Sequence, residues 1–161
     1  MENMRRAMTP VPTPRTSCLL LAITSIVILA SVFGFQYLGG AAPCQMCIWQ
    51  RYPYGVLIAL GLLGWFWQPR LMLGLGTLVL LVGAGIAGYH YGVEQGWFAL
   101  PAGCAAGGDA TSVEELRRML SEAPPACDQA QFSLFGWSLA AWNILASVVL
   151  AGLAAIATAK D

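Results

Sequence analysis

Two cysteines separated by two residues stand at Cys44 and Cys47, and an arginine follows at Arg51. Cysteines at this spacing form a disulfide that exchanges readily with other thiols, or they hold a metal ion. A purely structural disulfide is the third alternative, but a loop this short removes little entropy from the unfolded chain and therefore stabilises little. The spacing favours redox exchange over metal binding and over simple stabilisation.

Two further cysteines, Cys104 and Cys127, lie in the one long segment between apolar tracts, and we treat them as a second pair. Two pairs predict a relay in which a thiolate attacks a disulfide at each step. The fifth cysteine, Cys18, falls at the far end of the first apolar tract from Cys44. We expect it to be an inert buried thiol.

The composition places these cysteines in a membrane protein. Of the 161 residues, 58% are hydrophobic and 10% are charged, and the mean hydropathy is +0.66. The formal net charge is zero, so no basic surface for nucleic acid is expected. Asp, Glu, Lys and Arg are absent from four tracts, at 16–50, 52–69, 71–93 and 129–159. Each tract predicts one helix that crosses the bilayer.

The fold class that follows is an all-α membrane protein, a four-transmembrane-helix bundle in a single domain over 1–161. The expected spans are about 17–36, 52–67, 71–91 and 135–157, after a tail at 1–15. Loops at about 37–51 and 92–134 carry the two cysteine pairs. In the second loop, a capping-box pattern at 112–115 predicts a short amphipathic helix resting on the membrane surface.

The distribution of basic residues predicts the orientation of the bundle. Four spans place both termini on one side together with the turn near residue 70. That side carries Arg5, Arg6, Arg15, Arg70 and Lys160, against Arg51, Arg117 and Arg118 on the other. The positive-inside rule therefore makes both termini cytoplasmic and the cysteine loops periplasmic, if the membrane is a bacterial inner membrane. The periplasm is an oxidising compartment.

The sequence also indicates where the electrons go. A periplasmic oxidant of the thioredoxin type has a reduction potential of about −120 mV. Regenerating it with an ordinary dithiol pair, whose potential is about −270 mV, is uphill by roughly 7 kcal/mol. A stronger acceptor is needed, yet the chain carries no flavin or nicotinamide fold and no Cys-x-x-Cys-His haem motif. We therefore expect an acceptor dissolved in the bilayer, which a quinone provides.

Arg51 and His90 are the polar side chains best suited to assist. Beside Cys47, the charged guanidinium of Arg51 would stabilise a thiolate and the negative charge that develops on a reduced quinone oxygen. The alternative for Arg51 is an anchor at the membrane interface. His90, the single histidine of the chain, lies near the outer end of the third span. At that position His90 would reach a quinone head group or a proton path. The alternative is that it belongs to an aromatic belt at the interface and has no catalytic role.

From the first span to the end of the fourth, the sequence resembles the disulfide bond formation protein B (DsbB) family. The motifs that carry the resemblance are CQMCIWQR at 44–51, the stretch from His90 to Gln95, Cys104, and Cys127 before the last span. The resemblance implies a four-helix quinone reductase that reoxidises a periplasmic thioredoxin-like dithiol oxidase (DsbA). The electrons would pass to ubiquinone or menaquinone in the membrane quinone pool.

The resemblance also implies roles for individual residues. Cys104 would be the sulfur that the partner attacks, with Cys127 as its mate. Cys44 would exchange with Cys127, while Cys47 would face the quinone. The residues expected on the quinone side are Arg51, His90 and Gln95.

A membrane carrier that holds a metal ion through the four loop cysteines is the alternative from another functional class. A zinc site with four cysteine ligands needs every thiol reduced, which an oxidising compartment opposes. One free thiol in the purified protein would favour the relay, and five free thiols with stoichiometric zinc would favour the carrier. An enzyme like vitamin K epoxide reductase shares the relay chemistry, but the position of Cys44 and Cys47 after the first span disfavours it.

Overall fold

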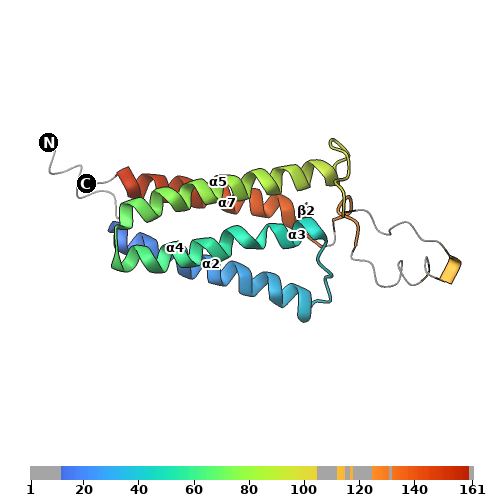
Figure 1. Ribbon diagram of the computed structural model, residues 1–161, viewed down its shortest axis with the longest axis horizontal. Helices are drawn as coiled ribbons and strands as arrows, with labels where there is room; N and C mark the ends of the chain where they lie inside the picture. Colours follow the sequence, from blue (N-terminus) through green and yellow to red (C-terminus); the bar gives the residue numbers. More distant parts are fainter. Residues whose placement is uncertain (1–11, 105–111, 115–116, 118–124, 131, 160–161) are drawn as a thin grey trace.

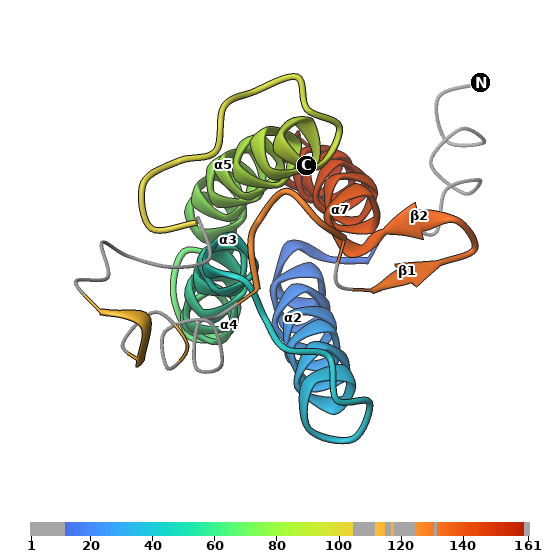
Figure 2. The same cartoon turned by 90° about the vertical axis from the view of Figure 1, so that its right-hand side faces the viewer.

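The structure is a computed structural model that describes residues 12–104, 112–114, 117, 125–130 and 132–159. In this part of the chain, four long helices lie side by side in an elongated bundle (Figure 1). Their bounds are α2 Pro14–Tyr37, α4 Arg51–Phe66, α5 Pro69–Glu94 and α7 Leu139–Ala159. Seen end-on (Figure 2), α5 and α7 are neighbours, and α2 lies across from them beside α4.

Local sequence signals explain where two of the helices begin. The Thr13 hydroxyl accepts a hydrogen bond from the Thr16 N–H, and proline occupies the first turn of α2. Pro69 likewise opens α5, directly after Gln68, whose φ of 43° lies in the left-handed region. Only Trp67 and Gln68 separate α4 from α5, so the two helices run antiparallel.

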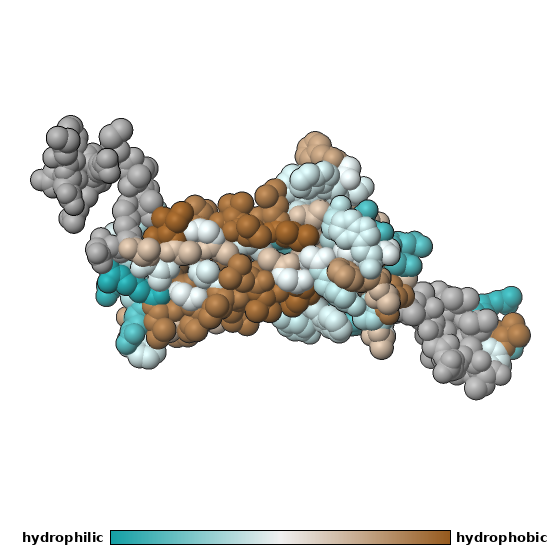
Figure 3. All heavy atoms as spheres, turned by 90° about the horizontal axis from the view of Figure 1, so that it is seen from above, coloured by the Kyte–Doolittle hydropathy of each residue, from teal (hydrophilic) through white to brown (hydrophobic). Residues whose placement is uncertain are grey.

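Among the described residues, three helices are long and apolar enough to cross a membrane. They are α2, α5 and α7, with mean hydropathies of 2.6, 2.1 and 2.1 over 18-residue windows. Figure 3 shows apolar side chains gathered along the middle of the bundle, with more polar residues toward its ends. The expectation of a helical membrane protein is confirmed to this extent. The expected second span, 52–67, corresponds to α4, which has 16 residues, and it stays a prediction.

The start of the last helix differs from the expected start near residue 135. Strands β1 Ser133–Leu134 and β2 Trp137–Ser138 form a small antiparallel hairpin, and α7 begins only at Leu139. Phe135 and Gly136, at the tip, have φ values of 53° and 80°, which suit a tight hairpin turn and not a helix. The amphipathic helix expected after residue 112 lies mostly outside the described residues.

The contact between α2 and α4 depends on two glycines. A β-carbon on Gly61 would lie 2.6 Å from the carbonyl oxygen of Cys18, and one on Gly64 would lie 2.5 Å from the Cys18 sulfur. Small residues at such positions permit close helix approach. Cys18 is fully buried in this contact, as expected, and its thiol donates to the carbonyl oxygen of Pro69 at 3.4 Å.

Candidate redox site

The first cysteine pair lies at the start of a short helix, α3 Gln45–Trp49. Cys44 is the N-cap of α3, and its Sγ accepts a hydrogen bond from the backbone N–H of Cys47 at 3.2 Å. Both cysteines are free thiols whose sulfur atoms lie 2.7 Å apart. This local turn holds the two sulfurs close enough to exchange a bond.

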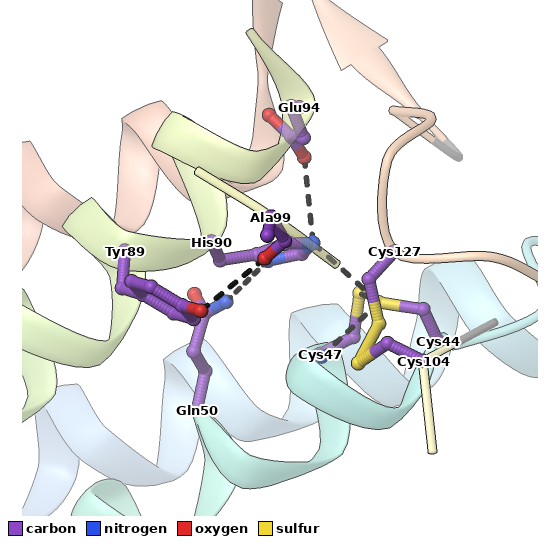
Figure 4. The surroundings of a disulfide bond; sticks show 9 residues. All are labelled: Cys44, Cys47, Gln50, Tyr89, His90, Glu94, Ala99, Cys104 and Cys127. Carbon is purple, nitrogen blue, oxygen red and sulfur yellow. Dashed lines mark hydrogen bonds and ion pairs between the residues drawn. A yellow bond between two sulfur atoms is a disulfide. The ribbon is translucent and has the colours of Figure 1, made fainter. Parts of the chain in front are cut away.

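The second pair, Cys104 and Cys127, forms a disulfide with a Cα–Cα distance of 5.3 Å. This disulfide packs in a buried cluster with Cys44, Met46 and Val93, and Cys47 borders the cluster. Figure 4 shows the disulfide directly beside Cys44 and Cys47. The structure therefore brings all four loop cysteines together at one end of the bundle.

The hydrogen bonds around the first pair favour a thiolate on Cys44. The bond from the Cys47 thiol lowers the pKa of Cys44 to about 4, with a further contribution from His90 and against the opposing effect of burial. The same bond to Cys44, together with burial, raises the pKa of Cys47. The two thiols are thus chemically unequal before any partner arrives.

A chain of buried side chains runs from Cys44 into the bundle. The Nε2 atom of His90 lies 3.5 Å from Cys44 Sγ, and its Nδ1 lies 2.6 Å from the Gln50 amide nitrogen. The Gln50 amide oxygen accepts from the amide nitrogen of Asn143 at 2.6 Å. The Asn143 oxygen in turn accepts from the Tyr54 hydroxyl. Gln50, His90 and Tyr54 are all less than a tenth exposed, so water does not replace these bonds.

Arg51 is held by helix α2. Its Nη1 donates to the Gln36 side-chain oxygen at 2.8 Å, and its guanidinium lies 4.9 Å from the centre of the Phe33 ring. The Nε–H of Arg51 is buried and has no hydrogen-bond partner among the described residues. The sequence predicts that Arg51 lies beside Cys47. In the structure, the side chains of Arg51 and Cys47 line the same cavity, while the hydrogen bond of the Arg51 guanidinium goes to Gln36.

This cavity has a volume of about 380 Å³, within the range of about 300–1,000 Å³ typical of small-molecule sites. Its wall is mostly apolar, from α2 and α7. Several polar or reactive side chains also line it, among them Gln36, Cys47, Gln50, Arg51, His90, Glu94 and Asn143. An apolar cavity with an unpaired buried donor and a thiol in its wall fits an apolar ligand that carries a polar, reducible ring.

Gln95 is not part of this cavity. It caps the C-terminus of α5 and lines a separate, smaller hollow with Tyr91 and Ser138. Sequence reasoning missed other polar residues that do line the main cavity: Gln36, Gln50, Glu94 and Asn143. Their signal was their occurrence within or at the ends of apolar tracts, where polar side chains usually have a function.

Cys44, Cys47 and His90 also form a group that could hold a metal ion, since their ligand atoms lie within 4.8 Å of one another. This group differs from the four-cysteine site of the carrier interpretation. Cys104 and Cys127 are joined to each other and offer no thiolate in this structure.

Several known proteins with similar sequences are described as disulfide bond formation protein B. The family model for "Disulfide bond formation protein DsbB" matches residues 14–157. Disulfide bond formation protein B of Albidiferax ferrireducens is 32% identical over 155 residues, which cover 89% of this chain and 87% of that protein. The protein of the same name from Verminephrobacter eiseniae is 31% identical over 148 residues, with 86% and 82% coverage. The uncharacterized protein RP370 of Rickettsia prowazekii is 25% identical over 138 residues, with 82% and 80% coverage. No solved structure matches the chain significantly.

Proposed function

The chain belongs to the family of disulfide bond formation protein DsbB, and we propose that it is a thiol:quinone oxidoreductase of the bacterial inner membrane. It would reoxidise a periplasmic thioredoxin-like dithiol oxidase of the DsbA type and pass the electrons to ubiquinone or menaquinone. The observation that carries the proposal is the packing of the Cys104–Cys127 disulfide against Cys44, next to a cavity that Cys47 lines.

In the proposed exchange, a thiolate of the partner attacks Cys104, the sulfur to which the resemblance to the family gives this role. A bond forms between the partner sulfur and Cys104 Sγ, and Cys127 leaves as a thiolate with the electron pair. The Cys127 thiolate then attacks Cys44 Sγ when Cys44 and Cys47 are joined. That bond breaks, and Cys47 leaves as a thiolate on the cavity side.

A quinone in the cavity would supply an acceptor for two electrons and two protons. Arg51 is the residue best suited to hold it, because Gln36 and Phe33 fix the guanidinium while its Nε–H stays free to donate to a ligand oxygen. The apolar walls from α2 and α7 would accommodate an isoprenoid tail and exclude water.

The proposed topology has four spans, both termini in the cytoplasm and the cysteine loops in the periplasm. Helix α4 alone rises about 24 Å, which is less than the roughly 30 Å hydrocarbon core. Gln50 alone separates α3 from α4, and its backbone is also helical. The run 45–66 therefore rises about 33 Å, enough to cross the bilayer with the cysteine pair at its outer end.

The test is reduction of a ubiquinone or menaquinone analogue by the purified protein, with a reduced thioredoxin-like dithiol protein as electron donor and absorbance as the readout. Serine at Cys44, Cys47, Cys104 or Cys127 is expected to abolish turnover. Cys18→Ala, which removes the buried thiol between α2 and α4, is the matched control and keeps it. Turnover that persists without Cys44 or Cys47 would refute the relay.

A further inference from the structure

We propose that Gln50 is a positioning residue that keeps the proton of His90 on Nε2, so that the imidazole donates a hydrogen bond to Cys44. The consequence for exchange rests on the proposed function. The position of the proton does not, and it can be measured without any activity.

On its inner side, the imidazole of His90 faces the side-chain amide of Gln50. A primary amide nitrogen carries two hydrogens and has no lone pair to offer, so it acts only as a donor. The Gln50 Nε2 atom lies 2.6 Å from His90 Nδ1. Nδ1 must therefore accept, which leaves the single proton of a neutral imidazole on Nε2.

The orientation of the Gln50 amide is fixed by the residues behind it. Its oxygen accepts from the Asn143 amide nitrogen at 2.6 Å. The Asn143 oxygen receives hydrogen bonds from two hydroxyls, those of Tyr54 and, at 3.4 Å, Ser147. Turning the Gln50 amide over would set two N–H groups against each other unless Asn143 turned as well. In a buried site such a mismatch leaves donors unsatisfied, which is costly.

The outer side of the imidazole leads to the same assignment independently. Nε2 lies 3.5 Å from Cys44 Sγ and 3.7 Å from a carboxylate oxygen of Glu94. A thiolate and a carboxylate both accept hydrogen bonds, so a proton on Nε2 is favoured there. Figure 4 shows the ring of His90 between Gln50 on one side and Glu94 and Cys44 on the other.

A proton fixed on Nε2 of His90 would stabilise Cys44 by a hydrogen bond when Cys44 leaves a disulfide as a thiolate. First, the second thiolate of the dithiol partner attacks the partner sulfur bound to Cys104, so that the partner leaves as a disulfide and Cys104 is released as a thiolate. In the resolving step, this Cys104 thiolate attacks Cys127 in a Cys127–Cys44 disulfide. The Cys104–Cys127 bond forms, the Cys127–Cys44 bond breaks, and Cys44 departs as a thiolate with the electron pair. His90 donates to that thiolate and keeps its proton, so no proton is transferred in the step. Stabilising the departing thiolate speeds exchange, because a leaving group of lower pKa leaves faster.

The same assignment bears on the group of Cys44, Cys47 and His90. Histidine binds a metal through a nitrogen without a proton. In this structure that nitrogen is Nδ1, which faces Gln50 and not the sulfurs. Both amides, Gln50 and Asn143, would have to turn before His90 could ligate beside the cysteines.

The chain has a single histidine, so ¹⁵N-histidine labelling reports on His90 alone. We would record long-range ¹H–¹⁵N correlations of the reduced full-length protein in lipid nanodiscs, purified with a tag that lacks histidine. The expected spectrum is that of a neutral imidazole protonated at Nε2. A spectrum of the Nδ1-protonated form would overturn the proposal, and this measurement needs no variant to fold.

Two variants test the part played by Gln50. In Gln50→Glu, a carboxylate in the same place accepts from Nδ1–H and should move the proton toward Nδ1. In Gln50→Met, the shape is nearly kept and the preference for Nε2 should weaken, because only the acceptors on the outer side, Cys44 and Glu94, remain. Gln68→Met makes the same chemical change at the opposite end of the bundle and should leave the spectrum unchanged.

The reactivity of Cys44 in the same samples gives the chemical readout. Loss of a hydrogen bond to a charged group should raise the pH midpoint of Cys44 alkylation by about one unit or more in Gln50→Glu. Folding is checked by the helical circular dichroism signal. A folded Gln50→Glu variant that keeps both the Nε2–H spectrum and the alkylation midpoint of the wild type would overturn the assignment of Gln50. Failure of quinone reduction in the wild type would overturn the proposed function but not this assignment.

Discussion

At the scale of single residues, the inequality of Cys44 and Cys47 is the chemical centre of the site. Their spacing alone predicts exchange, but it does not say which sulfur carries the charge. Cys44 receives the backbone N–H of Cys47 and faces His90, a residue far along the chain. The hydrogen bond between the two thiols is the largest cause that lowers the pKa of Cys44 and raises the pKa of Cys47, and His90 lowers the pKa of Cys44 further.

The low pKa of Cys44, about 4, predicts an unusual pH profile for its alkylation in the reduced protein. Above pH 4 the sulfur is a thiolate, so the rate should stay nearly constant from pH 9 down to about 5 and fall only below that. An unperturbed thiol would lose reactivity below about 8.5. Labelling with iodoacetamide, followed by mass spectrometry of the Cys44 peptide, measures the profile. A midpoint near 8 or 9 would contradict the assignment.

Arg51 is expected to act on quinone binding. Replacing it with alanine removes a free, buried N–H from the cavity wall, and the KM for the quinone analogue should rise about tenfold or more. Arg70→Ala, at the opposite end of the bundle, is the matched control and should leave the KM unchanged. Equal KM values for Arg51→Ala and the wild type would reduce Arg51 to an interface anchor.

The sequence predicted the cysteines of the site better than their polar neighbours. Arg51 was expected beside Cys47, but its partners are Gln36 and Phe33 on α2, across a loop that no local pattern describes. Helix geometry could have separated the other candidates. His90 and Glu94 are four residues apart and share a helix face that lines the main cavity, whereas Gln95, one residue further on, lines only the smaller hollow.

At the scale of elements, the close contact of α2 with α4 positions the α2 wall of the cavity relative to Arg51. Gly61 makes this contact possible, because a β-carbon there would lie 2.6 Å from the Cys18 carbonyl oxygen. Backbone atoms cannot move aside as a flexible side chain can. The two helices would have to separate to admit even one methyl group.

Gly61→Ala is therefore expected to lower the free energy of unfolding by about 1–3 kcal/mol, as overpacking does. Gly55→Ala is the matched control on the same helix, since a β-carbon there would meet nothing within 4 Å. Thermal unfolding in one detergent compares the two variants with the wild type. A Gly61→Ala variant as stable as Gly55→Ala would show that the contact tolerates separation.

Hydropathy predicted the long helices because a tract without charges is a strong signal for a membrane helix. It did not predict the hairpin at 133–138 or the short helix α3. Both lie inside uncharged tracts, where a hydropathy average does not register a turn. The turn at Phe135 and Gly136 depends on positive φ angles, and Gly136 was the only local residue that indicated them.

At the scale of the whole molecule, the first turn of α2 and the last turn of α7 lie at one end of the bundle, and α3, which Cys44 caps, lies at the other (Figure 1). The sequence predicted that both cysteine loops meet on one side. It could not predict that the Cys104–Cys127 disulfide is buried against Cys44, because that contact joins three segments distant in sequence.

The proposed orientation predicts which end of the bundle is reached from outside the cell. In a variant whose native cysteines are replaced, Val113→Cys should react with a membrane-impermeant maleimide on intact spheroplasts, because Val113 is 70% exposed near the cysteine end. Gln68→Cys, at the opposite end, should react only after the membrane is permeabilised. The reverse pattern would place the cysteine loops in the cytoplasm and exclude a periplasmic partner.

The central claim is that both cysteine pairs deliver their electrons to a quinone, and an anaerobic thiol count tests it most directly. The fully reduced protein has five free thiols. Each equivalent of a soluble quinone analogue should remove two of them, so that three remain after one equivalent and only Cys18 after two. Five thiols that persist in excess quinone would contradict the account.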